Sequence, residues 1–101
     1  MASLQPRYLE RSAARIADVT ALLAEGACLR NDDLVAIRMV FHDFAGTAGS
    51  LGFTEIGEEA RKADDLILAM RRSEVDLNTV NIGLLREHAA RVSAMIEKER
   101  R

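Results

Sequence analysis

Between residues 34 and 51 the apolar side chains recur every three or four positions without interruption, and no other feature of the chain limits its fold as strongly. This spacing places the side chains on one face of an α-helix, which has to be buried against other elements. No segment alternates apolar and polar residues as a half-buried strand does. The pattern therefore predicts an all-α fold, and its members are Leu34, Ile37, Phe41, Phe44, Ala48 and Leu51.

Three further stretches of the chain carry apolar residues with the same helical periodicity. A length of 101 residues suits a single domain, 1–101, with one core. Because the connections are short and each stripe covers only one face, we expect an antiparallel up-down-up-down four-helix bundle. The helices are expected to cover roughly 7–25, 33–49, 54–72 and 78–98.

Polar residues at the expected helix starts are candidate N-caps, because their side chains can accept hydrogen bonds from free backbone N–H groups. Residues 30–33 precede the second helix, Thr54 the third, and Asp76 or Asn78 the fourth. Glycines that follow the second helix indicate that its end is loosened. These signals fix where the expected helices begin and end.

Charge and cysteine content exclude several classes of function. The formal net charge is -2 with both signs interspersed, so no nucleic-acid partner is expected. Cys28 is the single cysteine, which leaves no internal disulfide or cysteine pair and suits a reducing compartment. No window reaches the length of a membrane span. We expect a cytoplasmic protein without a membrane partner, and the start methionine and charged end suit a free-standing one.

His42 is the one residue of the second helix whose position is unexpected for its type. At about 100° per residue its side chain points about 135° away from the apolar stripe, so the imidazole is expected to stand in solvent. Gly46 follows one turn later on the same face. Glycine inside a helix costs roughly 0.5–1 kcal/mol relative to alanine, so its presence favours the close approach of another surface.

The neighbours of His42 outline a surface for partner docking. Small residues follow the histidine on the outward face, and two apolar side chains border it. The expected docking residues are Val35, Met39, Ala45, Gly46 and Gly49.

The stretch from His42 to Gly52, His-Asp-Phe-Ala-Gly-Thr-Ala-Gly-Ser-Leu-Gly, resembles the phosphoacceptor motif of histidine phosphotransfer (HPt) domains. The matching residues are His42, Phe44, Gly46, Leu51 and Gly52, and the segment 60–66 resembles the third helix of that family. The resemblance implies a four-helix bundle whose exposed histidine takes a phosphoryl group from a receiver aspartyl phosphate or a histidine kinase and passes it to a receiver aspartate. Such a domain is a phosphocarrier without kinase activity of its own.

One position departs from the family pattern. HPt domains usually place a lysine three residues after the histidine, beside the phosphoryl group, and this chain has Ala45 there. Arg38, four residues before the histidine on the same face, is our hypothesis for a replacement positive charge that stabilises the phosphoryl group.

The chemistry of the residue type agrees with this role. A neutral imidazole nitrogen is a good nucleophile near neutral pH and forms a high-energy phosphoramidate. Phosphoryl transfer needs magnesium, but no acidic cluster of the sequence is arranged for a metal, so the receiver partner is expected to supply it and no cofactor is expected here. Asp43 is expected to be a solvated charge. We expect a monomer whose partners are response-regulator receiver domains or a sensor histidine kinase.

Two other interpretations stay open. Ala45 also suits a degenerate bundle that binds a signalling partner without phosphoryl transfer. The gap at Ala45 and Gly46 could also receive a second copy of the chain, which ranks last. His88 has no matching context and is expected to be a packing or surface residue. A di-iron site is excluded, because neither histidine has a glutamate three residues before it.

Overall fold

Four α-helices and one short 3-10 turn form the protein in the computed structural model, which describes residues 4–24 and 29–100. The helices are α1 (Leu4–Ala24), α2 (Asn31–Thr47), α3 (Thr54–Arg71) and α4 (Thr79–Arg100), and the turn η2 covers Gly49–Leu51. The part of the chain described contains no strand, which confirms the all-α prediction. Cys28 lies outside the described residues. No helix within the described ranges is both long and apolar enough to cross a membrane.

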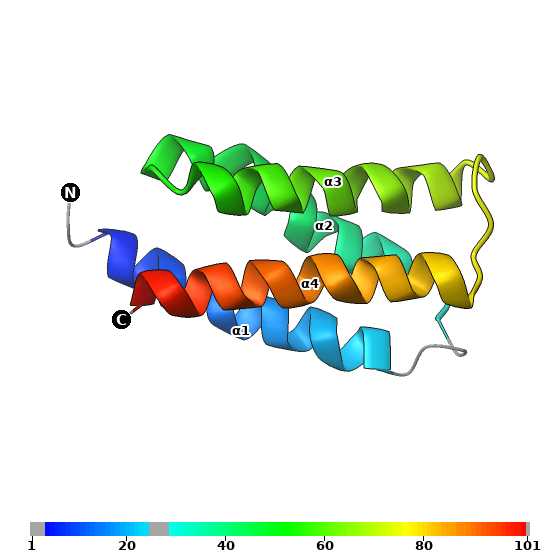
Figure 1. Ribbon diagram of the computed structural model, residues 1–101, viewed down its shortest axis with the longest axis horizontal. Helices are drawn as coiled ribbons and strands as arrows, with labels where there is room; N and C mark the ends of the chain where they lie inside the picture. The colour runs from blue at the N-terminus through cyan, green and yellow to red at the C-terminus, as the bar shows by residue number, and fades with distance from the viewer. Residues whose placement is uncertain (1–3, 25–28, 101) are drawn as a thin grey trace.

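Figure 1 shows the four helices side by side along one long axis, with the colour running in alternate directions from each helix to the next. Contacts are most extensive between α2 and α3, followed by α1 with α4 and α3 with α4, while α1 and α2 touch less. The bundle is elongated, with principal extents of 41, 22 and 19 Å. Each helix therefore has two neighbours and one face left for solvent or partners.

The apolar stripes read from the sequence meet in one core. Most of the predicted stripe residues of all four helices are buried, with Leu51 of the second stripe only half-buried in the turn after α2. The largest fully buried side chains are Phe41, Phe44, Leu23, Ile37, Ile67, Leu85, Ile96, Val19 and Val92. Burial of such side chains contributes about 1.5–3 kcal/mol each, so the core holds α2 with its apolar face inward. The opposite face of α2 is consequently fixed outward.

The second helix begins at Asn31, two residues earlier than expected, and its cap lies within the predicted stretch 30–33. Arg30 is the N-cap, and the Asp33 carboxylate reaches back to accept a hydrogen bond from its backbone N–H at 2.9 Å. Thr54 was predicted as a cap but is the first residue of α3, whose N-cap is Phe53 without a side-chain bond. Asn78 caps α4 as predicted, since its Oδ1 accepts from the Asn81 N–H at 2.9 Å.

The end of α2 is tightened rather than loosened. After Thr47 the chain makes the 3-10 turn η2, and Gly52 adopts a left-handed conformation with φ 91°. The N–H of Phe53 donates to the carbonyl of Ala48 at 2.8 Å, and that of Gly52 to Gly49 at 3.1 Å. This pattern is a Schellman motif, which requires glycine at the left-handed position and turns the chain into α3.

A buried carboxylate joins α3 to α4. Glu59 of α3 is only 7% exposed, and it accepts a short hydrogen bond from His88 of α4 and lies 3.4 Å from Nη1 of Arg91. Burial raises the pKa of the Glu59 carboxyl, but the hydrogen bond and charge of His88, with Arg91 and Lys62, outweigh it and lower the pKa below its ordinary value of 4.5. His88 is thus a packing residue, as the sequence predicts, with a specific partner.

We expect the Glu59 carboxylate to stabilise the fold in a pH-dependent way. Because its pKa is lowered on folding, its contribution is present above about 4.5 and is lost as the pH falls through the lower folded value. Glu59→Gln should lower the free energy of unfolding by about 1–3 kcal/mol at pH 7, and the deficit relative to wild type should shrink towards about pH 3. Urea denaturation across this pH range measures it. The exposed neighbour Glu58→Gln is the control, and equal pH profiles for the two variants would contradict the assignment.

Candidate functional site

His42 stands on the outward face of α2, as predicted from the helical geometry. Its side chain is 62% exposed, while the preceding residue, Phe41, is fully buried in the core. Because α2 is held by its apolar stripe, the histidine cannot turn inward without unpacking that stripe. The fold therefore presents this imidazole to solvent beside α3, the helix with which α2 makes its most extensive contacts.

The imidazole of His42 is held by a carboxylate from the neighbouring helix. Its Nδ1 lies 3.0 Å from Oδ2 of Asp64 on α3, whose side chain is only 13% exposed. A carboxylate accepts hydrogen bonds, so the imidazole is expected to carry its proton on Nδ1, with the lone pair on Nε2. In an exposed histidine this arrangement supplies a defined nucleophilic nitrogen on an oriented ring.

Arg38 binds the other oxygen of the same carboxylate. Its Nε lies 2.9 Å from Oδ1 of Asp64, and both atoms are buried and make no directed hydrogen bond, so the contact is an ion pair. Asp64 thus joins Arg38 and His42, which lie one turn apart on α2. The positive charge of Arg38 compensates the buried carboxylate. Its role beside a phosphoryl group remains a prediction, and the structure gives this residue a partner that the sequence did not indicate.

Asp64 is the site residue that sequence reasoning missed. It lies on α3 between the buried residues Ala60 and Ile67, four positions after one and three before the other. A charged residue at that spacing falls at the edge of the buried face and needs a partner. This signal was available in the sequence, but it does not reveal which residue of another helix is the partner.

The predicted docking residues surround His42 with unequal exposure. Met39 is 60% exposed, Gly46 and Gly49 are exposed, and Val35 and Ala45 are half-buried. A Cβ atom placed on Gly46 or Gly49 would meet nothing within 4 Å. The fold itself therefore does not require glycine at position 46. Gly49, expected within the helix, begins the η2 turn.

Asp43 points towards α1 and not towards His42. Its Oδ2 pairs with Nη2 of Arg15 at 2.9 Å, and its side chain is half exposed. It is thus a paired surface charge where the sequence predicted a solvated one. In the described ranges 4–24 and 29–100, no group of three or more His, Cys, Asp or Glu side chains is placed to hold a metal ion.

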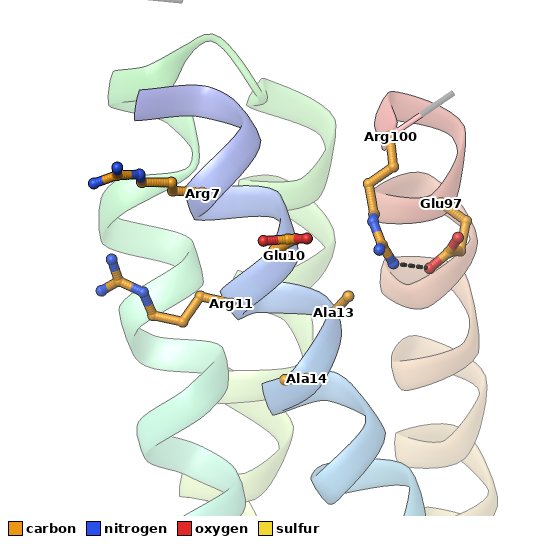
Figure 2. Close-up of a pocket in the computed structure, with 7 residues that line it drawn as sticks. All are labelled: Arg7, Glu10, Arg11, Ala13, Ala14, Glu97 and Arg100. Carbon is orange, nitrogen blue, oxygen red and sulfur yellow. Dashed lines mark hydrogen bonds and ion pairs between the residues drawn. The ribbon is translucent and has the colours of Figure 1, made fainter. Parts of the chain in front are cut away.

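A large hollow of about 780 Å³ lies on another pair of helices, between the start of α1 and the end of α4. Figure 2 shows Glu10 and Ala14 on α1, Ala13 projecting from α1 towards α4, and the Arg100–Glu97 ion pair on α4. Arg7 and Arg11 extend away from α4 in this view. The hollow is open and mixed in charge, and its lining shares no residue with the surroundings of His42.

Within the described residues, the structure is an all-helical bundle with an exposed histidine, His42, whose imidazole is held by a carboxylate. The family model of the Hpt domain matches residues 4–95, which is most of the chain. The chain belongs to the Hpt domain family, and the resemblance noted in its sequence is confirmed. Hpt domains act as phosphocarriers in phosphorelays, so a phosphotransfer role follows. Comparison with curated proteins gives no match, and comparison with solved structures gives none either.

Replacement of the Asp64 carboxylate should remove the preference of the His42 ring for one tautomer. An amide can either donate or accept, so Asp64→Asn no longer requires a proton on Nδ1. We expect the neutral ring to shift from predominantly Nδ1–H towards a mixture of both forms. Long-range ¹H–¹⁵N NMR spectra of the imidazole distinguish the two tautomers. The exposed neighbour Asp65→Asn is the control, and an unchanged tautomer in Asp64→Asn would refute the assignment.

Gly46→Ala tests whether the glycine serves docking. Since nothing lies within 4 Å of the added Cβ, the free energy of unfolding of the variant should be about 0.5–1 kcal/mol higher than that of wild type. A partner surface that approaches closely at Gly46 should bind the variant more weakly than wild type. Gly83→Ala on α4 also has free space for its Cβ and serves as the matched control for stability. Urea denaturation and titration with receiver domains measure both effects, and unchanged receiver binding would count against docking at Gly46.

Proposed function

We propose that this antiparallel up-down-up-down bundle is a phosphorelay intermediate that carries a phosphoryl group on Nε2 of His42. The observation that supports this assignment best is the exposed imidazole whose Nδ1 is held at 3.0 Å by Asp64. The phosphoryl group comes from the aspartyl phosphate of a receiver domain or from a histidine kinase, and it is passed on to a receiver aspartate. The domain acts as a cytoplasmic monomer and has no kinase activity of its own.

The acceptance step follows from the tautomer. The Nε2 lone pair attacks the phosphorus of the donor's aspartyl phosphate, an N–P bond forms, and the P–O bond to the donor carboxylate breaks, its electron pair leaving with that carboxylate. The His42 ring then carries the phosphoryl group on Nε2 and a proton on Nδ1, with a positive charge spread over the ring. Transfer onward reverses these changes, because a receiver carboxylate attacks phosphorus and Nε2 regains its electron pair.

Asp64 orients the His42 ring and does not contact the phosphoryl group. Its carboxylate stabilises the positive ring that acceptance produces, since the two lie within hydrogen-bond distance. Arg38 limits this effect by sharing the same carboxylate at 2.9 Å. A shared carboxylate stabilises the charged ring less than an undivided one does, which keeps the phosphoryl group transferable. The magnesium that such transfer requires is expected on the receiver partner.

The partner surface is the outward face of α2 around His42. Met39 supplies exposed apolar area, and Gly46 and Gly49 let a second backbone approach the imidazole. Close approach is required because the acceptor nitrogen and the phosphorus have to come within about 3–3.5 Å for in-line transfer. Receiver domains of response regulators are the partners proposed for this face.

Ala45 supports a second candidate function, a degenerate bundle that binds a signalling partner without chemistry. The family's usual lysine is absent at this position, so the positive charge nearest to the histidine on its own helix is Arg38, which Asp64 already occupies. This candidate predicts receiver binding with no covalent product.

Phosphoryl labelling decides between the two functions. Receiver domains charged by a small-molecule phosphodonor with magnesium are mixed with wild type and with His42→Gln, and the label on the bundle is followed. We expect acid-labile, base-stable label on wild type and none on His42→Gln, because no other described histidine is exposed: His88 is 15% exposed. His88→Gln is the matched control and should be labelled like wild type. Receiver binding without label on wild type would instead support the binding-only function.

A further inference from the structure

Two contacts show how α2 and α3 are aligned beside the histidine. A Cβ atom added to Gly57 would lie 3.5 Å from the Gly49 nitrogen, so the two backbones are in contact there. Asp64, two turns further along α3, contacts His42, which lies two turns further back along α2. Two residues that lie between these contacts line the same groove. They are Ala45 on α2, one turn after His42, and Arg61 on α3, one turn before Asp64.

The space between these two residues is open. A groove of about 490 Å³ runs between α2 and α3, with Ala45 and Gly49 on one wall and Gly57 and Arg61 on the other. The methyl group of Ala45 leaves room that a long side chain from its own helix would fill. Arg61 is exposed and, within the part of the chain that the structure describes, forms no hydrogen bond or ion pair. Its guanidinium is thus free to move within the groove, whose α2 wall includes Ala45, one turn after His42.

The charges around this groove favour Arg61 over the other cations. Arg38 is already paired with Asp64 at 2.9 Å. Lys62 borders the groove but lies near Glu59 on the side towards α4. Glu58 and Asp65, three residues before and four after Arg61, are exposed carboxylates that compete for it only as weak surface partners. A phosphoryl group carries about two negative charges and attracts a guanidinium more strongly than a single carboxylate does.

We propose that Arg61 is the cation that binds the phosphoryl oxygens on phosphorylated His42, reaching from α3 across the groove that Ala45 leaves open. This proposal rests on the proposed phosphocarrier function. The guanidinium offers paired N–H donors to two phosphoryl oxygens, a geometry that an ammonium group lacks. Arg61 replaces, from the neighbouring helix, the positive charge that α2 does not supply beside the histidine. It is a ligand of the phosphoryl group and not a nucleophile.

The first measurement is the equilibrium partition of the phosphoryl group between a receiver domain and the bundle. A cation that contacts the phosphoryl group stabilises the phosphorylated bundle and not the free one, so Arg61→Gln should shift the partition towards the receiver by about three- to tenfold. Lys62→Gln removes the same charge on the adjacent residue and should shift it by less than about twofold. Arg61→Lys should recover part of the loss. Equal shifts of the partition in Arg61→Gln and Lys62→Gln would mean that the shift reflects the loss of one positive charge and not a contact with the phosphoryl group, and would overturn the proposal.

The second measurement reports contact with the phosphoryl group directly. In ³¹P NMR titrations of the phosphorylated protein, a neighbouring guanidinium favours the dianion and lowers the pKa of the phosphoryl group. We expect this pKa to be higher in Arg61→Gln than in wild type and in Lys62→Gln. Asp64, Glu58 and Asp65 are unchanged in all three proteins, so their charges do not cause the difference.

The outcomes separate the two proposals. Absence of label on wild type, with receiver domains that are themselves phosphorylated, refutes the phosphocarrier function. Label on wild type with an unchanged partition and an unchanged ³¹P titration in Arg61→Gln leaves that function intact and refutes the role of Arg61. Circular dichroism melting confirms that the variants are folded, which is expected because the Arg61 side chain is exposed and pairs with none of the described residues.

Discussion

The buried carboxylate of Asp64 is the interaction on which the site depends. It lies in the contact between α2 and α3, with Arg38 on one oxygen and His42 on the other. A buried carboxylate without partners is costly, so the site is stable only when α2 and α3 are aligned so that both groups reach it. The same bond that orients the imidazole therefore also ties the outward face of α2 to the fold. The cluster of Arg38, Asp64 and His42 thus both stabilises the contact between α2 and α3 and orients the imidazole.

Much of the fold was predictable from the sequence because burial follows helical periodicity. The unbroken spacing from Leu34 to Ala48 requires a helix with one buried face, and His42 is exposed because it lies outside that stripe. Helix ends were harder to predict. Thr54 is of a residue type that often caps helices, but it is the first residue of α3, because the Schellman motif at Gly52 fixes where that helix starts. The capping preference of threonine is overridden by a turn whose hydrogen bonds span six residues.

The site was predictable only to the extent that it lies on one helix. Exposure of His42 and the small residues after it follow from positions on α2. Asp64 and Arg61 lie on α3, and their relation to His42 depends on how far α3 slides along α2, which no single-helix pattern states. That alignment is set by the close approach at Gly57 and by the Schellman turn before it. The position of His42 on its helix and the family resemblance both indicated the histidine, whereas only the tertiary contacts identify the Asp64 carboxylate.

Glu59 and Asp64 together restrict the rotation of α3 about its own axis. Five residues apart, the two carboxylates leave α3 on different sides, one to His88 on α4 and the other to His42 on α2. A rotation of α3 that preserved one contact would break the other, so the helix is locked about its own axis. The smallest unit of this site that could be transferred is therefore a pair of helices with a third to hold them. A histidine motif moved alone onto a foreign helix would lack the carboxylate that accepts its hydrogen bond.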